Sequence, residues 1–283
     1  MLLFKKEKDL KAFIQQEKLA GKKVGFVPTM GALHDGHLSL MALSLETTDV
    51  TVCSIFVNPT QFNNADDLEK YPRTIENDIV MLETAGVQVL FLPSVEEVYP
   101  KNLTYPDFDF NGLDHLMEGE HRPGHFEGVA QVVYRLLDIV QPTDLFMGQK
   151  DYQQWRIIQS MLEQVDWDIK LVRCPIARAT DGLALSSRNV RLTEEARQIA
   201  PKIRQILSKA KAEIQDLSIG EVKNNAVRRL NKIEAFKMDY FEIVDGQSLQ
   251  LVKDKSNTQS LVACTAVYIA NIRLIDNIIL KAL

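Results

Sequence analysis

The stretch PTMGALHDGH, Pro28–His37, is the most informative segment of this chain for predicting the fold. It follows the apolar run Val24–Val27 and precedes Leu38–Leu45, which has the composition of a helix. We therefore predict a turn between a strand and a helix, with His34 and His37 inside it. Such a turn directs backbone N–H groups and the positive end of the helix dipole above the sheet. The two imidazoles would add donors, so we expect this turn to bind the phosphates of a nucleotide.

His34 and His37 have two simpler interpretations, as zinc ligands or as solvated polar residues at a helix start. Zinc would need a third ligand, and the sequence offers no Cys/His cluster to supply one. The HExxH pattern of zinc proteases is also absent, because Gly36 stands where that helix would continue. Phosphate binding is the interpretation that the surrounding strand and helix favour.

Composition narrows the class of protein. The 283 residues are 46% hydrophobic, enough for one large or two smaller cores, and the formal net charge is −5. That charge predicts no general binding of nucleic acid, so a phosphate site must be local. We find neither the apolar region of a signal peptide nor a membrane-spanning run, and we expect a cytoplasmic protein. The three cysteines, Cys53, Cys174 and Cys264, lie far apart in the sequence, and an odd number cannot all form disulfide pairs. We therefore expect them to be buried thiols.

The first part of the chain alternates between strand-like and helix-like segments. Alternation of this kind predicts right-handed βαβ units and a mostly parallel sheet covered on both faces. We therefore predict an α/β fold, with a Rossmann-like doubly wound domain over residues 1–176 and ligands at the carboxyl ends of its strands. The expected strands are 24–27, 50–57, 87–92, 145–147 and 169–173, and the expected helices are 38–45, 74–85, 128–140 and 152–164.

The character of the chain changes after Pro175. Residues 176–189 form an irregular link, and long amphipathic helical stretches are expected at about 194–216 and 219–233. Strand-like runs follow at 239–244 and 261–270. We therefore predict a smaller α+β domain over residues 177–283.

Three further segments place polar side chains after predicted strands or in the link. Each also has a simpler interpretation, as a turn, a helix cap or a hinge without a ligand. The segment 54–62 contains Gln61, which could hold a hydroxyl and a carboxylate. The segment 146–154 contains Gly148, Lys150, Asp151 and Gln154, and 182–189 contains Ser186, Ser187 and Arg188, a compact set of anion-binding groups. His125 either faces the same sheet edge or caps a helix.

These motifs carry a family resemblance. HDGH at 34–37 resembles the HxGH signature of the nucleotidyltransferase superfamily, and Leu185–Arg188 resembles its KMSKS-like phosphate loop. The chain further resembles the pantothenate synthetase family over nearly its whole length, with Ala177 and Ala179 departing from the usual residues. The segments that carry the resemblance are PTMGALHDGHLSL, SIFVNPTQF, YPRT, RPGHFEGV, GQKDYQQ, DGLALSSRN and RLIDN.

The resemblance implies that ATP-dependent condensation of (R)-pantoate with β-alanine proceeds through a pantoyl adenylate and releases AMP and pyrophosphate. It implies that Mg²⁺ assists, that the protein is a homodimer, and that Gln61 and Gln154 bind pantoate. Asp78 is a candidate metal ligand, and the apolar 53–57 region is a candidate for the interface. His34, His37, Lys150 and Arg188 are the implied catalytic residues. The implied nucleotide contacts are Met30, His34, His37, Gly148, Lys150, Asp151, Ala177, Leu185, Ser186, Ser187 and Arg188.

Two other functions fit the same motifs. One is an HxGH nucleotidyltransferase with another small acceptor, such as a pantetheine phosphate. That acceptor would call for extra basic residues, whereas Gln61 and Gln154 suit an uncharged polyol with one carboxylate. The other is a nucleotide sensor that catalyses no reaction. Binding alone would not require four charged or histidine side chains at one site.

Overall fold

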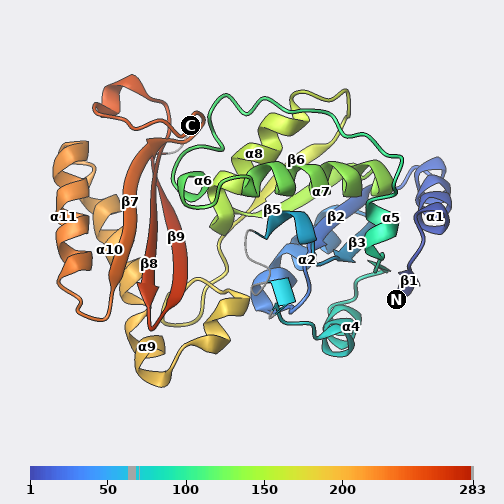
Figure 1. Cartoon of the computed structure of the whole chain (residues 1–283), viewed down its shortest axis with the longest axis horizontal. Coiled ribbons are helices and arrows are strands. Elements are labelled where there is room, and N and C mark those ends of the chain that lie inside the picture. The colour runs from blue at the N-terminus through green and yellow to red at the C-terminus, as the bar shows by residue number, and fades with distance from the viewer. Residues whose placement is uncertain (63–67, 70, 282–283) are drawn as a thin grey trace. The chain divides into compact units, whose positions relative to one another are not determined.

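The computed structural model describes residues 1–62, 68–69 and 71–281. The chain divides into two compact units, shown in Figure 1. The first consists of Met1–Gly148 and Gln154–Pro175, and the second of Gln149–Gln153 and Ile176–Leu283. A short segment from the middle of the chain therefore belongs to the C-terminal unit.

The first unit is built on a six-stranded parallel sheet in the order β1-β4-β3-β2-β5-β6. The strand order reverses between β2 and β5, which makes the sheet doubly wound and places a ligand crevice at the carboxyl ends of those strands. The α/β prediction is confirmed. The strands are β1 (Leu2–Phe4), β2 (Val24–Thr29), β3 (Val50–Ile55), β4 (Val89–Phe91), β5 (Asp144–Gly148) and β6 (Lys170–Cys174).

Helices cover both faces of this sheet, so its central strands are buried on both sides and consist mostly of apolar residues. Gly25 in β2 allows one of these helices to approach closely, because a Cβ there would lie 2.2 Å from the Ser44 hydroxyl. The helices are α1 (Glu7–Leu19), α2 (Asp35–Thr47), α4 (Ile75–Thr84), α5 (Val95–Val98), α6 (Glu118–His121), α7 (His125–Val140) and α8 (Tyr152–Leu162), with the short η1 (Pro59–Gln61) after β3.

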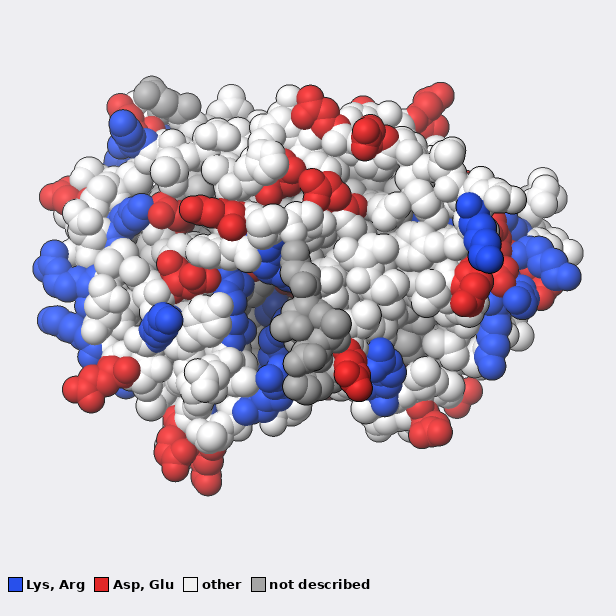
Figure 2. Space-filling model, viewed as in Figure 1, with Lys and Arg blue, Asp and Glu red and all other residues white. Residues whose placement is uncertain are grey.

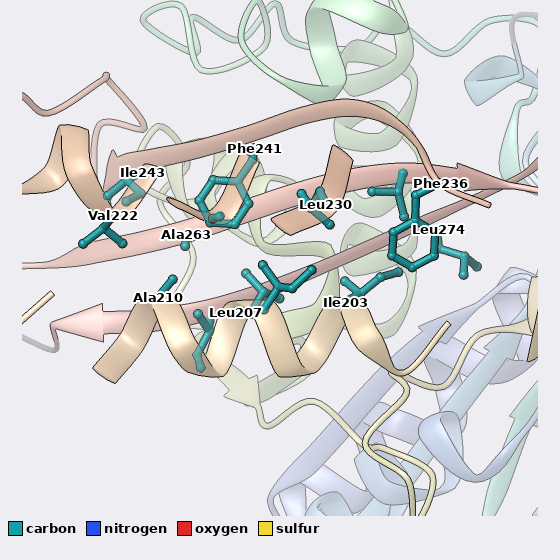
Figure 3. Close-up of a cluster of buried hydrophobic side chains, with 14 of the residues drawn as sticks. Ile203, Leu207, Ala210, Val222, Leu230, Phe236, Phe241, Ile243, Ala263 and Leu274 are labelled. Atoms are coloured by element: carbon teal, nitrogen blue, oxygen red, sulfur yellow. The ribbon is translucent and has the colours of Figure 1, made fainter. Parts of the chain in front are cut away.

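The second unit is an antiparallel sheet, β7-β8-β9, with helices packed on one face. Figure 3 shows Leu207 and Ala210 of one helix below Phe241 and Ala263 of the sheet, with Ile203 of the same helix beside Leu274. The elements are α9 (Glu194–Ile199), α10 (Lys202–Glu213), α11 (Ile219–Asn231), β7 (Lys237–Asp245), β8 (Leu261–Ile269) and β9 (Ile272–Lys281), with the short helices η2 (Gln149–Asp151), η3 (Ser187–Arg191) and η4 (Lys255–Asn257).

Several elements differ from the sequence prediction. The expected helix at 194–216 is two helices, α9 and α10, because Pro201 stands at the junction and cannot continue an α-helix. The expected strand at 50–57 ends at Ile55, before the Asn58-Pro59 turn. The elements β1, α1 and β9 were not predicted. In β9 the polar pair Asp276-Asn277 interrupts the apolar pattern.

The three cysteines are free and buried, as predicted. Residues 53–56 of the proposed interface region are also buried, at 5% exposure or less, so their side chains do not offer a surface to a partner. Basic and acidic side chains both occur across the face shown in Figure 2, so this face is not uniformly basic. None of the helices in the described ranges has the length and apolar character needed to cross a bilayer.

Candidate active site

The turn after β2 presents the two histidines at the start of α2. His34 is the N-cap residue, and its Nδ1 accepts a hydrogen bond from the Gly36 backbone N–H at 3.0 Å. A neutral His34 therefore carries its proton on Nε2, which makes that atom a donor. The ring centroids of His34 and His37 are 4.1 Å apart, and both residues are half-buried. The structure thus brings together the two histidines predicted to bind phosphate.

A buried carboxylate holds the backbone of this turn. Asp78 of α4 is 0% exposed and accepts hydrogen bonds from the N–H groups of Ala32 at 3.0 Å and Leu33 at 2.9 Å. The Thr74 hydroxyl donates to it at 3.1 Å. Gly31 and Ala32 have φ angles of 79° and 49°, and the left-handed conformation costs a non-glycine residue about 1–2 kcal/mol. The hydrogen bonds to Asp78 offset that strain and fix the turn.

The environment of Asp78 does not fit the metal ligand that the sequence suggested. Both of its oxygens already accept hydrogen bonds, and the side chain has no contact with solvent. Within residues 1–62, 68–69 and 71–281, no group of three or more His, Cys, Asp or Glu side chains could hold a metal ion. Asp78 therefore supports the histidine turn through the chain's own backbone.

Gln61 lies in η1, and its side-chain amide is held at both ends. Its Oε1 accepts a hydrogen bond from Asn58 Nδ2 at 3.1 Å, and its Nε2 donates to Met30 Sδ at 3.0 Å. The Gln61 carbonyl oxygen lies 3.0 Å from His125 Nδ1. The structure therefore brings together Met30 and Gln61. It also places His125, at the start of α7, in contact with the Gln61 backbone.

Asn58 is a residue of this region that the sequence analysis did not single out. It is 1% exposed, and its Nδ2 also donates to the Gly128 carbonyl at 3.1 Å, while its Oδ1 accepts from the Tyr99 hydroxyl at 2.8 Å. Burial raises the pKa of Tyr99 to about 12, so this hydroxyl remains a donor. The only sequence signal was an Asn directly after a buried strand, which equally indicates a turn.

Gly128 allows α7 to approach this cluster. A Cβ at Gly128 would lie 2.6 Å from the Thr60 carbonyl oxygen and 3.1 Å from the Gln61 backbone nitrogen. These are backbone atoms, which cannot rotate away. A side chain here would push α7 off the η1 segment and displace Gln61.

Gly148 and Gln154 complete the predicted residues of the first unit. Gly148 ends β5, which pairs with β2, so it lies at the same carboxyl edge as the histidine turn. Among the described residues, a Cβ at Gly148 would meet one atom within 4 Å, the Cδ1 of Leu40 at 4.0 Å. Gln154 lies near the start of α8 and is half-buried.

The second unit carries the other predicted phosphate-binding groups. Lys150 and Asp151 lie in η2, with the Lys150 Nζ 3.6 Å from Asp151 Oδ1. The Lys150 side chain is 19% exposed, whereas that of Asp151 is 48% exposed. Lys150 is thus a largely sheltered cation, and its charge is less screened than that of a surface lysine.

The loop resembling KMSKS follows a narrow antiparallel turn. The Leu185 N–H donates to the Ala177 carbonyl at 3.0 Å, so these two predicted residues lie opposite each other. Ser186 then caps η3, and its Oγ accepts from the Arg188 N–H at 3.3 Å. Ser186 and Ser187 are half-buried, and Arg188 is exposed. The hydroxyls and the guanidinium are therefore contiguous on one loop.

The predicted site residues divide between the two units. The first unit holds the histidine turn and the glutamines, and the second holds the lysine and the serine-arginine loop. The first group is Met30, His34, His37, Gln61, Gly148 and Gln154, and the second is Lys150, Asp151, Ala177, Leu185, Ser186, Ser187 and Arg188.

A doubly wound parallel sheet with an HxGH turn at its switch point defines an α/β nucleotide-binding enzyme of the HxGH class. The sequence model of the pantoate-beta-alanine ligase family matches residues 2–279. The chain therefore belongs to the pantoate-beta-alanine ligase family. It is an ATP-dependent ligase that joins pantoate to β-alanine.

Similar proteins agree with this assignment. The chain is 47% identical over 271 residues to a pantothenate synthetase of Bacteroides fragilis, with 96% of each chain covered. It is 46% identical to one of Porphyromonas gingivalis, with 98% and 99% covered. A pantothenate synthetase structure from Thermus thermophilus matches with a TM-score of 0.92 at 38% identity, covering 99% of this chain and 100% of that one.

A second solved structure was obtained with ligands. It is the pantoate-beta-alanine ligase of Francisella tularensis complexed with beta-gamma ATP and beta-alanine, and it matches with a TM-score of 0.79 at 36% identity. The match covers 99% of this chain and 98% of that chain.

Proposed function

We propose that this chain condenses pantoate with β-alanine in two steps, and that its own residues act by positioning and by charge stabilisation. In the first step a pantoate carboxylate oxygen attacks the α-phosphorus of ATP, and the bond to pyrophosphate breaks. In the second, the β-alanine nitrogen attacks the acyl carbon, and the bond to AMP breaks. Adenylation is needed because a free carboxylate resists attack by an amine.

The proposal requires no covalent intermediate on the enzyme. Burial raises the pKa of Cys53 to about 12 and that of Cys174 to about 11, so neither is a ready nucleophile. Catalysis by positioning and electrostatics suffices for in-line displacement at phosphorus.

The observation that carries the proposal is the orientation of the histidine turn. Because His34 Nδ1 accepts from Gly36, its Nε2 can donate to a phosphate oxygen, alongside the N–H groups at the start of α2. His37, whose ring packs at a tilt against that of His34, would contribute to charge stabilisation at the same phosphates. We assign this electrostatic role to His37 in preference to proton transfer, since pyrophosphate bound to Mg²⁺ leaves readily without a proton.

The other predicted residues take roles that follow from their chemistry. Lys150, Ser186, Ser187 and Arg188 would stabilise the transferring and leaving phosphates. Gln61, whose amide is held by Asn58, would hold pantoate together with Gln154. The nucleoside contacts would come from Met30, Gly148, Asp151, Ala177 and Leu185.

The remaining features extend this proposal. We assign residues 1–176 as the nucleotide- and pantoate-binding domain and 177–283 as a smaller lid, with the segment Gln149–Gln153 packed in the same unit as the lid. Mg²⁺ would be held mainly by the ATP phosphate oxygens, since this ion usually takes few protein ligands at phosphate sites. Bound there, it would neutralise charge on the leaving pyrophosphate. We also propose that the protein is cytoplasmic and forms a homodimer.

A two-stage assay tests the reaction. The protein is mixed with ATP, Mg²⁺ and pantoate, and pyrophosphate is measured before β-alanine is added and AMP is followed. We expect about one equivalent of pyrophosphate per site, and steady AMP release only after β-alanine. A product that retains AMP would identify a nucleotidyltransferase instead. ATP binding without any pyrophosphate release would identify a sensor.

A further inference from the structure

Two buried polar residues of β9, Asp276 and Asn277, have no role in the proposed chemistry. They belong to the near-terminal segment RLIDN, in a strand that is otherwise mostly apolar. Asp276 is 4% exposed and Asn277 is 2% exposed. Burying polar groups costs free energy unless every group is hydrogen-bonded, and apolar residues of similar volume would pack at least as well. Both side chains therefore need hydrogen-bonding partners within the fold.

Asn277 binds the segment that carries Lys150. Its Nδ2 donates to the carbonyl oxygen of Gln149 at 2.9 Å and to that of Lys150 at 2.8 Å. Its Oδ1 accepts from the Gln149 Nε2 at 3.1 Å. The Asn277 side-chain amide thus fixes the peptide groups before and after the Lys150 Cα atom. The position of this backbone determines where the Lys150 ammonium group can reach.

Asp276 binds Arg178, which lies in the turn that precedes the serine-arginine loop. Its two oxygens accept from the two terminal nitrogens of Arg178 at 2.7 and 2.8 Å, and one of them also accepts from the Asn277 N–H at 2.8 Å. Arg178 in turn donates to the Gly182 carbonyl at 3.1 Å. Arg178 and Gly182 lie in the narrow turn that ends where Ser186 begins.

A chain of hydrogen bonds therefore runs from the Lys150 carbonyl through Asn277, Asp276 and Arg178 to the Gly182 carbonyl, in the turn that precedes Ser186. All of its members belong to the second unit. Lys150 lies at one end of this chain, and the turn at the other end leads into the loop 186–188. We assign side chains of both to the ATP phosphates. Bidentate pairing of Arg178 with Asp276 adds directional rigidity that a single bond would lack.

We propose that Asp276 and Asn277 are positioning residues, which place Lys150 and the loop 186–188 at a set spacing for the ATP phosphates. This inference rests on the proposed phosphate roles of Lys150 and Arg188. Neither β9 residue touches a reacting atom in this scheme. They act by holding the two cationic elements in one arrangement before ATP binds.

The test compares Asn277→Ala with a matched control, Asp239→Asn. The control breaks an ion pair between β7 and β9 of the same sheet, in which Arg273 donates to Asp239 at 2.8 and 2.9 Å. Single-turnover pyrophosphate release from ATP and pantoate is the readout. We expect Asn277→Ala to slow it by roughly 10–100-fold, the scale of a misplaced catalytic group. Asp239→Asn should stay within about twofold of the parent, since the pair of Asp239 with Arg273 lies outside the chain of hydrogen bonds that reaches Lys150.

A double-mutant cycle with Lys150→Ala separates positioning from general destabilisation. If Asn277 acts through Lys150, adding Asn277→Ala to Lys150→Ala should slow adenylation only slightly more, by less than about threefold. Full multiplication of the two effects would overturn the inference, as would equal losses in Asn277→Ala and Asp239→Asn. A normal rate in Lys150→Ala alone would reject the proposed role of Lys150, and this inference with it.

A second variant keeps the test decisive if Asn277→Ala folds poorly. Arg178→Lys retains the charge but cannot make the bidentate pair with Asp276. We expect it to raise the KM for ATP by roughly fivefold, the effect of losing about 1 kcal/mol of hydrogen bonding. An unchanged KM for ATP would overturn the link to the loop 186–188.

Discussion

The two groups of phosphate-binding residues are supported in different ways. In the first unit, backbone N–H groups of the histidine turn donate hydrogen bonds to Asp78, which is 0% exposed. The loop 186–188 of the second unit is held from its base, through Arg178 and Asp276, while Arg188 is exposed and Val190 is 88% exposed. One support is part of a packed core, and the other is a polar chain that ends in a solvent-facing loop.

Groups with the same ligand chemistry are thus held in place by different kinds of interaction. Disturbing the support of the histidine turn should cost both stability and activity, because it leaves buried groups unsatisfied. Removing an exposed or half-buried phosphate-binding side chain of the second unit, such as Lys150, should cost activity with less effect on folding. The variants below test that contrast.

The largest effect is expected for Lys150→Ala. Removing one charge-stabilising group from a phosphoryl-transfer site typically costs 10²–10³-fold, so adenylation should slow by roughly that factor. Because the Lys150 side chain is not part of a hydrophobic core, Tm should change little. A pyrophosphate burst close to that of the parent would contradict the assignment.

The next variant is Asp78→Asn, which breaks the support of the histidine turn. The carboxamide can turn only one oxygen toward the Ala32 and Leu33 N–H groups, so stability should fall by about 1–3 kcal/mol in a denaturant titration. Adenylation should also slow by roughly 10–100-fold, since the turn carries His34. Thr74→Val is the control, because it removes one donor to Asp78 and leaves both N–H bonds. A stable Asp78→Asn with full activity would show that the turn needs no such support.

A smaller effect is expected for Gln154→Ala in the first unit. Losing one or two hydrogen bonds to pantoate should raise its KM by roughly fivefold or more. The KM for ATP should stay within about twofold, because we assign Gln154 to pantoate alone. If ATP binding weakened more than pantoate binding, the role taken from the family resemblance would be wrong.

The smallest effect is expected away from both groups, at the Glu213–Arg229 pair of α10 and α11. The hydrogen bond from Arg229 holds the pKa of Glu213 below its usual 4.5. Its stabilisation is therefore present above pH 4.5 and is lost as pH falls through the lowered pKa. Glu213→Gln should lower the unfolding free energy by about 0.5 kcal/mol at pH 7, with the difference vanishing in acid. Adenylation should be unchanged at pH 7.

The pattern of the first 175 residues predicted the parallel sheet because buried parallel strands must be apolar on both faces. It predicted the histidine turn because a strand, two glycines and a helix are adjacent in the sequence. The β9 strand was not predicted, since Asp276 and Asn277 break its apolar run, and their side-chain partners Arg178, Gln149 and Lys150 are 98 to 128 residues away in the chain. Local pattern carries no information about such partners.

The sequence by itself determined the α/β class, the position of the HDGH turn and the family of the chain, because each depends on residues that are neighbours in the chain. The tertiary structure decided that Asp78 supports a backbone turn where a metal ligand was the candidate. It also decided that Asn58 holds Gln61 and that Gln149–Gln153 belongs to the C-terminal unit. The physical reason is that a buried polar group takes its role from the partners that folding brings to it.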